Sequence, residues 1–93
     1  MRSFRWSRAK NRWLQRERDV SFEAVVVAIG AGHLLDVLEH RNPGRYPGQR
    51  VMVVNIDGYA YLVPFVEATG HVFLKTVIPS RKATQQYLKR SET

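Results

Sequence analysis

The feature of this sequence that most constrains its fold is a series of short apolar segments between residues 51 and 78. Val51 to Ile56 and Tyr59 to Glu67 are separated only by Asp57-Gly58, a dipeptide that strongly predicts a tight β-hairpin between apolar strands. After a second turn the apolar pattern resumes at Val72 to Ile78. Three consecutive antiparallel strands are therefore expected.

A fourth strand is expected before the hairpin. His33 to His40 alternates in polarity, and the segment 42–48 that follows contains two prolines and two glycines, a composition typical of a loop. Pro64 lies inside an expected strand and predicts a local distortion, because proline has no N–H to donate to a neighbouring strand. The sequence predicts a four-stranded antiparallel meander.

Helices are expected on both sides of this meander. Ser7 and Ser21 are suitable N-caps for a helix that ends near Arg18 and for a second helix over Phe22 to Ile29. Ser80 is suited to cap a last helix that ends near Arg90. With 93 residues there is room for one core. We therefore predict a single α+β domain over residues 1–93, with two N-terminal helices, the meander and a C-terminal helix.

Apolar patterning and cysteine content bear on location. The longest apolar run, Ala24 to Leu35, is shorter than the roughly 20 residues needed to span a bilayer, and the charged N-terminus does not resemble a signal peptide. The chain contains no cysteine, which fits a reducing compartment. We expect a soluble cytoplasmic protein.

The charge of the chain predicts a polyanionic partner. Its formal net charge is +7, and eleven of its fifteen basic residues are arginine, the side chain best suited to bidentate phosphate contacts. Seven basic residues lie in or beside the first helix: Arg2, Arg5, Arg8, Lys10, Arg12, Arg16 and Arg18. They form either an RNA-facing surface, with Arg8 and Arg12 as binding residues, or an ordinary solvated face. Nucleic acid is the favoured partner.

A strand-to-helix corner near the C-terminus is the best candidate site. An apolar strand pattern ends at Pro79, and Ser80, Arg81 and Lys82 follow at the expected helix start. Such a corner places a hydroxyl group and two cations together, which suits the binding of phosphate.

The chain resembles the BrnT toxins of bacterial type II toxin–antitoxin systems. The resemblance covers Phe4 to about Tyr87, and it rests on four short segments in order: Phe4-Arg5-Trp6, Lys10-Asn11, Val20-Ser21-Phe22-Glu23 and Arg81-Lys82-Ala83-Thr84. The chain departs from the family at Ser7, where an Asp is usual, and at Tyr87, where many members have a Glu. The resemblance implies a small RelE-like endoribonuclease that binds a cognate antitoxin, similar to ribbon-helix-helix proteins, in a hetero-oligomer.

The activity implied by this resemblance is RNA cleavage without a metal. It requires positive charge to stabilise the phosphorane, together with groups that accept and donate protons. We expect five basic side chains to gather on one rim of the sheet: Lys10, Arg50, Lys75, Arg81 and Lys82. Arg81 is expected to be the main residue that binds the phosphate. Ser80 completes the expected RNA-binding set.

Candidates for proton transfer are fewer. Glu67 and Tyr87 are proposed as catalytic residues. The simpler interpretation is that Glu67 is a solvated carboxylate and that Tyr87 is packed against the sheet. His33, His40 and His71 lie at strand ends, where histidines are usually exposed and passive.

No metal or cofactor is expected. Asp36 and Glu39 are three residues apart on a strand and would face opposite sides, and Gly30-Ala31-Gly32 is too short for a phosphate-binding loop.

Tyr59 and Tyr61 share one strand face and serve either as core or as a base-stacking platform.

The alternative function is a BrnT-like module that binds RNA or a protein without cleaving RNA. DNA binding is less favoured, because no helix-turn-helix spacing is evident.

Overall fold

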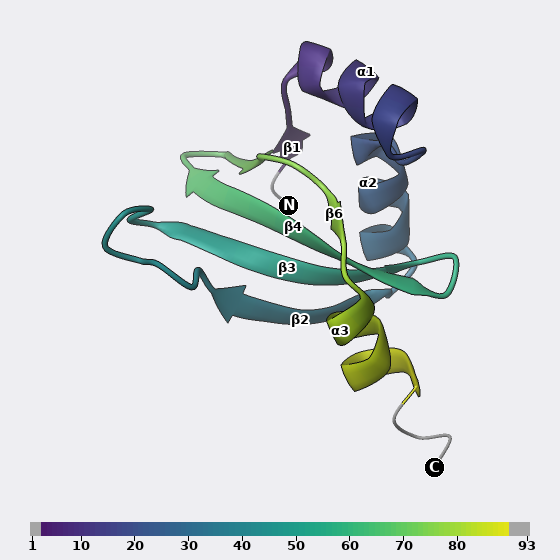
Figure 1. The fold of residues 1–93 in the computed structure, drawn as a ribbon. Coiled ribbons are helices and arrows are strands. Elements are labelled where there is room, and N and C mark those ends of the chain that lie inside the picture. The colour runs from purple at the N-terminus through teal and green to yellow at the C-terminus, as the bar shows by residue number, and fades with distance from the viewer. Residues whose placement is uncertain (1–2, 90–93) are drawn as a thin grey trace.

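Two capped helices open the fold. The computed structural model describes residues 3–89, and in it α1 (Arg8–Glu17) and α2 (Phe22–Gly30) begin immediately after their predicted caps (Figure 1). The Ser7 hydroxyl accepts a hydrogen bond from the Lys10 N–H at 3.1 Å, and the Ser21 hydroxyl accepts one from Ala24 N–H at 3.1 Å. Each serine thus satisfies a backbone donor that the first helical turn leaves unpaired.

The sheet contains six strands in the described part of the chain: β1 (Ser3–Arg5), β2 (Leu34–Glu39), β3 (Gln49–Ile56), β4 (Tyr59–Ala68), β5 (His71–Leu74) and β6 (Ile78–Pro79). The strand order is β1-β5-β4-β3-β2, and β6 pairs with β4. Neighbours from β2 to β5 are antiparallel, whereas β1 is parallel to β5. The α+β class is confirmed, but the expected four-stranded antiparallel sheet is wrong because the sheet is larger and mixed.

Strand β1 was not expected because it leaves almost no sequence signal. It has three residues, and its register places Phe4 beside Val72, far away in the sequence. Three residues cannot display an alternating pattern of useful length. A pairing partner so distant in the chain can be recognised only once the fold is known.

The distortion expected at Pro64 lies in the strand opposite it. Strand β4 keeps an unbroken register with β3, in which Pro64 pairs with Val51. The Pro64 carbonyl accepts a hydrogen bond from Lys75 N–H at 2.8 Å, so the proline nitrogen faces the same side and offers no donor there. Residues 75–77 leave the sheet at this point, and pairing resumes at Ile78 with Leu62. The expected continuous strand from Val72 to Ile78 is therefore split into β5 and β6.

The Asp57-Gly58 turn joins β3 to β4 as predicted. Both turn residues have positive φ angles, 54° for Asp57 and 83° for Gly58, as the favoured two-residue hairpin turn requires. The Asn55 side chain accepts a hydrogen bond from Gly58 N–H at 2.8 Å. Ile56 and Tyr59 form the last pair of the ladder before the turn.

Helices α1 and α2 cover one face of the sheet and enclose the main core (Figure 1). Leu14, Phe22 and Val25 from the helices are fully buried against the strands. The Trp6 ring stacks on Phe22 with ring centroids 5.5 Å apart. Both tryptophans are partly buried against this core, as expected from their spacing with Leu14.

A buried asparagine fixes the angle between these two helices. Asn11 is only 7% exposed, and its Oδ1 accepts a hydrogen bond from Phe22 N–H at 2.8 Å. Its Nδ2 donates to Glu23 Oε1 at 2.7 Å, and this bond holds the pKa of Glu23 below its ordinary value. The segments Lys10-Asn11 and Val20-Ser21-Phe22-Glu23 thus meet in one joint between α1 and α2.

The C-terminal helix packs on the opposite face of the sheet. It begins after Ser80 as predicted, but α3 (Arg81–Thr84) gives way to a π-helical turn, η1 (Gln85–Lys89). Ala83 packs with Val53 and Ala60 in a second, smaller cluster on this face. The expected helix end at Arg90 and the basic residue Arg2 lie outside the described residues. No helix within residues 3–89 combines the length and apolar character needed to cross a membrane.

Candidate nucleic-acid interface

The sheet face opposite α1 and α2 carries an open groove. Helix α3 and η1 cover only one end of this face. Beside them lie two adjoining hollows of about 390 and 290 Å³ that share Leu38, Arg41 and Leu62. We call these hollows together the β-face groove. Its floor is apolar and comprises Leu38, Val51, Val53, Leu62, Pro64 and Ile78, and its polar walls include Glu39, His40, Arg41, Ser80, Lys82, Gln86 and Tyr87.

The wall formed by α3 is fixed firmly to strand β4. The backbone N–H of Ser80 donates to the Ala60 carbonyl at 3.0 Å. The Thr84 hydroxyl, which is 2% exposed, accepts from Ala60 N–H at 2.9 Å and donates to the Ser80 carbonyl at 2.8 Å. The Ser80 hydroxyl caps the helix by accepting from Ala83 N–H at 3.1 Å. The corner predicted from the sequence is therefore rigidly attached to the sheet.

Cations from two separate segments line the β-face groove. Lys82 lies on α3, and Arg41 lies two residues after the end of β2. Arg81 precedes Lys82 in the first turn of α3, and both residues are exposed. An anionic backbone lying in the groove would meet positive charge from two separate elements.

Tyr87 forms the rest of the α3 side of the groove and is bonded to strand β2. Its hydroxyl donates a hydrogen bond to Asp36 Oδ2 at 2.7 Å, while Asp36 Oδ1 accepts from Val37 N–H at 2.8 Å. The phenolic proton is thereby directed at a carboxylate, and a phenolic oxygen is able to accept a proton as well as to donate one. The Tyr87–Asp36 pair suits a proton acceptor better than a proton donor.

Arg50 and Glu67 form an ion pair on the other face of the sheet. The Arg50 guanidinium bonds to Glu67 Oε1 and lies 5.4 Å from the centre of the Phe65 ring. Phe65 belongs to the core beneath α1 and α2. The side chains of the pair are 41% and 37% exposed. The sheet therefore separates both residues from Lys82 and Tyr87, and the expected gathering on one rim does not include them.

The remaining predicted cations also lie away from the β-face groove. Lys10 Nζ is 4.0 Å from the centre of the Trp13 ring on α1, and Arg8 and Arg12 are exposed on the same helix. Lys75 lies in the segment between β5 and β6, with its Nζ 5.7 Å from the centre of the Phe73 ring. Of the ten residues proposed from the sequence, Ser80, Lys82 and Tyr87 line the groove and Arg81 adjoins it.

One of the three histidines lines the groove. The His40 ring packs against Tyr46 in a tilted arrangement with ring centroids 4.4 Å apart. Its Nδ1 accepts a hydrogen bond from Asn42 N–H at 3.0 Å, which assigns the proton of the neutral ring to Nε2. His33 and His71 lie at other strand ends, His33 just before β2 and His71 at the start of β5.

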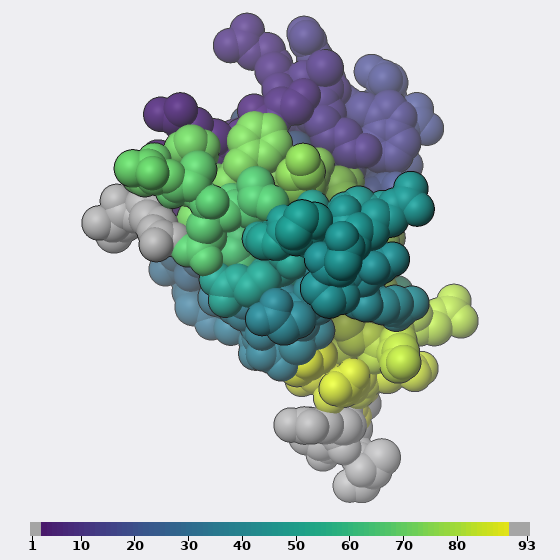
Figure 2. Space-filling model, turned by 90° about the vertical axis from the view of Figure 1, so that its left-hand side faces the viewer, coloured from purple at the N-terminus to yellow at the C-terminus, as the bar shows by residue number. Residues whose placement is uncertain are grey.

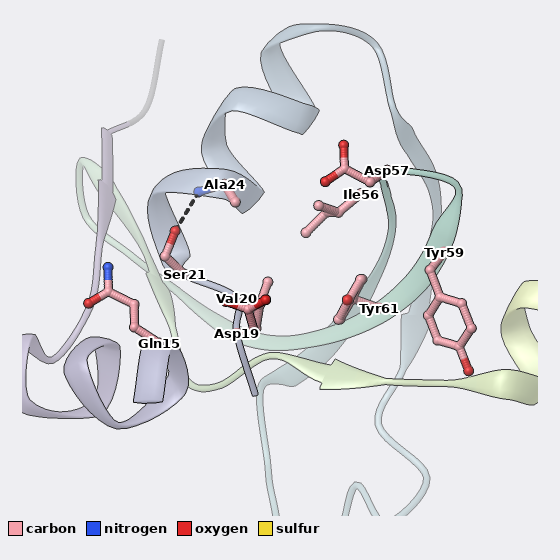
Figure 3. Close-up of a pocket in the computed structure, with 9 residues that line it drawn as sticks. All are labelled: Gln15, Asp19, Val20, Ser21, Ala24, Ile56, Asp57, Tyr59 and Tyr61. Atoms are coloured by element: carbon pink, nitrogen blue, oxygen red, sulfur yellow. Dashed lines mark hydrogen bonds between the residues drawn. The ribbon is translucent and has the colours of Figure 1, made fainter. Parts of the chain in front are cut away.

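A different pocket lies between the α1–α2 joint and the β3–β4 hairpin (Figure 3). It has a volume of about 340 Å³, and Asp19, Asp57 and Tyr61 are among its lining residues. Burial, followed by the nearby carboxylate of Asp57, raises the pKa of Tyr61. Two carboxylates and no Lys or Arg side chain line this pocket, so it repels phosphate and is a poor site for RNA. Tyr61 packs against the main core, which favours the core reading of this tyrosine.

Sequence reasoning did not identify Arg41 as a groove residue or Asp36 as the partner of Tyr87. Arg41 directly precedes the proline- and glycine-rich loop and follows the last residues of β2, so its only signal was its charge beside an expected strand end. Asp36 was considered only as a metal ligand. Its bond to Tyr87 joins residues 51 positions apart, and no local pattern predicts such a pairing.

Comparisons with family models, with curated proteins and with solved structures found no match. Within residues 3–89, no three side chains of the His, Cys, Asp or Glu type lie together as a possible metal site. The residues of the β-face groove therefore carry the functional argument.

Proposed function

We propose that this protein is a BrnT-like, RelE-like toxin that cleaves RNA without a metal. The observation that carries the proposal is the β-face groove, in which Arg41 and Lys82, from two separate segments of the chain, line a hollow with an apolar floor. A net charge of +7 supports a polyanionic partner. The resemblance in four short segments supports the toxin class.

In the proposed reaction the groove residues hold the phosphate and move two protons. Arg81, Lys82 and Arg41 stabilise the charge that develops on the phosphorane. The ribose 2′-hydroxyl gives its proton to the Tyr87 oxygen as the phenolic proton passes to Asp36. The 2′-oxygen bonds to phosphorus, the bond to the 5′-oxygen breaks, and that oxygen takes a proton from the Lys82 ammonium group. Catalytic roles for Lys10, Arg50 and Glu67 stay predictions that this scheme does not use.

A cleavage assay with two groove variants tests this scheme. Purified protein is incubated with end-labelled RNA in excess EDTA, and the first-order cleavage rate is measured. Tyr87→Phe keeps the ring but removes the proton acceptor, so the rate should fall by about 10²- to 10⁴-fold. Lys82→Gln should also slow cleavage, whereas Lys89→Gln is a matched control with the same change of charge outside the groove. Wild-type rates in Tyr87→Phe would refute the role of the Tyr87–Asp36 pair.

A second candidate function is RNA or protein binding without cleavage. It is favoured by the contacts of the proton-transfer candidates, since Glu67 is bonded to Arg50 and the Tyr87 hydroxyl to Asp36. Both bonds suit structural roles. If the wild-type protein binds RNA with strong salt dependence but leaves it intact, and its expression does not slow growth, this second function is correct.

We further propose that a cognate antitoxin, similar to ribbon-helix-helix proteins, neutralises the toxin in a cytoplasmic hetero-oligomer. The exposed cations Arg81 and Lys82 support a partner that covers them with acidic residues. Expression of the toxin alone should arrest growth, and co-expression of a ribbon-helix-helix antitoxin encoded beside it should restore growth. A complex whose contacts avoid both cations would contradict the proposed mode of neutralisation.

A further inference from the structure

Helix α1 displays a row of arginines on its outer face. Arg8, Arg12 and Arg16 are all exposed, and their spacing of four residues places them on one side of the helix. The fully buried Leu14 lies on the opposite side. With a rise of 1.5 Å per residue, the row is about 12 Å long. We call these three residues the arginine row.

The row dominates the charge of its part of the molecule. Residues 3–18 contain six basic side chains and a single acidic one, Glu17. Glu17 lies 3.7 Å from Arg16, and the two side chains are 66% and 52% exposed, so this contact is weak. The row therefore presents a nearly unopposed positive surface.

Aromatic rings near the row are already occupied. Lys10 and Arg18 both lie over the Trp13 ring, with the Arg18 Cζ 4.8 Å from its centre, and Trp6 stacks on Phe22. Binding of single-stranded nucleic acid usually relies on exposed aromatic rings that stack on bases. The surface instead suits contacts with phosphates alone, as in the recognition of double-helical RNA.

The row lies far from the β-face groove. Helix α1 is on one face of the sheet and α3 is on the other, at opposite ends of the molecule (Figures 1 and 2). In Figure 2 the strands occupy the surface between the purple α1 segment and the yellow C-terminal segment. Contacts at the row would thus be separate from contacts at Lys82.

We propose that the arginine row is a second RNA-binding surface that contacts the phosphate backbone of an RNA duplex. The choice of RNA rests on the proposed function, whereas the choice of a duplex rests on the occupied rings. Such a surface would hold the protein on structured RNA while the β-face groove engages an unpaired segment. Its contacts would be independent of base sequence.

Equilibrium binding to a labelled RNA hairpin with a long perfect stem tests this proposal. Fluorescence anisotropy is measured over a series of salt concentrations for wild type, Arg12→Gln/Arg16→Gln and the control Arg45→Gln/Lys89→Gln. Both variants lose two charges. If each arginine contacts one phosphate, the row variant should bind more weakly, and its slope of log K against log salt should be shallower by about 2. The control should keep the wild-type slope, and Arg12→Lys/Arg16→Lys should largely restore it.

Three results would overturn the proposal. An equal change of slope in the control would show that the effect comes from net charge alone. An unchanged slope in the row variant would show that the arginine row does not contact phosphates. An equal change of slope in the row variant for a DNA duplex or for single-stranded RNA would contradict the choice of partner. Circular dichroism confirms that each variant is folded. This experiment measures only binding to the hairpin stem. If the protein does not cleave RNA, the catalytic proposal is refuted, but the proposal that the arginine row binds an RNA duplex is not affected.

Discussion

Replacing Thr84 with valine should loosen the corner that positions the candidate site. The Thr84 hydroxyl is the acceptor for the N–H of Ala60, and Ala60 is 0% exposed. Valine has nearly the same shape but no acceptor, so this N–H becomes a buried, unpaired donor. The Ser80 carbonyl loses one bond but still accepts from Thr84 N–H at 3.0 Å. The main cost is therefore the unpaired Ala60 N–H, about 1–3 kcal/mol of unfolding free energy.

Thr84→Ser provides the matched control, because it keeps the hydroxyl and removes one buried methyl group at a cost of about 0.8 kcal/mol. Urea unfolding and thermal unfolding give the two free energies. Each kcal/mol lost should lower the melting temperature by about 4–8 °C in a domain of this size.

Hydrogen exchange locates the effect at one amide. In Thr84→Val the Ala60 amide should exchange faster than in wild type, while amides of the main core should change only as far as global stability does. If valine and serine variants are equally stable and the Ala60 amide is equally protected in both, the hydroxyl does not hold the corner as described.

Three further outcomes follow from buried polar groups and shifted pKa values. Asn11→Leu should lower the unfolding free energy by about 1–3 kcal/mol, because Phe22 N–H loses its buried acceptor; a variant as stable as wild type in urea would contradict the role of the helix joint. The lowered pKa of Glu23 should stabilise the fold above pH 4.5, its ordinary value, and this contribution should disappear as the pH falls through the folded pKa; Glu23→Gln should lack that part of the pH profile of urea unfolding. The raised pKa of Tyr61 should favour the fold below pH 10, its ordinary value, and this contribution should be lost as the pH rises through the folded pKa. In an ultraviolet titration, wild type should contain a late-ionising tyrosine that Tyr61→Phe lacks. If the two proteins show the same late-ionising tyrosines, the prediction is refuted.

Local chemistry predicted the starts of the helices and the central hairpin. Ser7, Ser21 and Ser80 each accept the backbone hydrogen bond expected of an N-cap. Asp57-Gly58 adopts the positive φ angles that its hairpin requires. These features depend on a few adjacent residues, so the sequence contains the whole signal.

Pairings between distant residues could not be predicted in this way. Strand β1 depends on a parallel partner almost 70 positions away, and the break before Ile78 depends on Pro64 in a different strand. The same limit applies to the candidate site. The corner at Ser80 was found from its own residues, but the assignment of Arg50 and Lys82 to opposite faces depends on strand register. The sequence pattern did not determine that register.

The central claim is that RNA lies in the β-face groove, and amide chemical shifts test it most directly. The labelled protein is titrated with a short single-stranded RNA that carries a non-cleavable 2′-O-methyl backbone. We predict that the largest shift changes fall on two separate segments, Leu38–Arg41 and Ser80–Tyr87. Changes confined to the acidic pocket around Asp19 and Asp57, or none in either groove segment at saturation, would contradict the account.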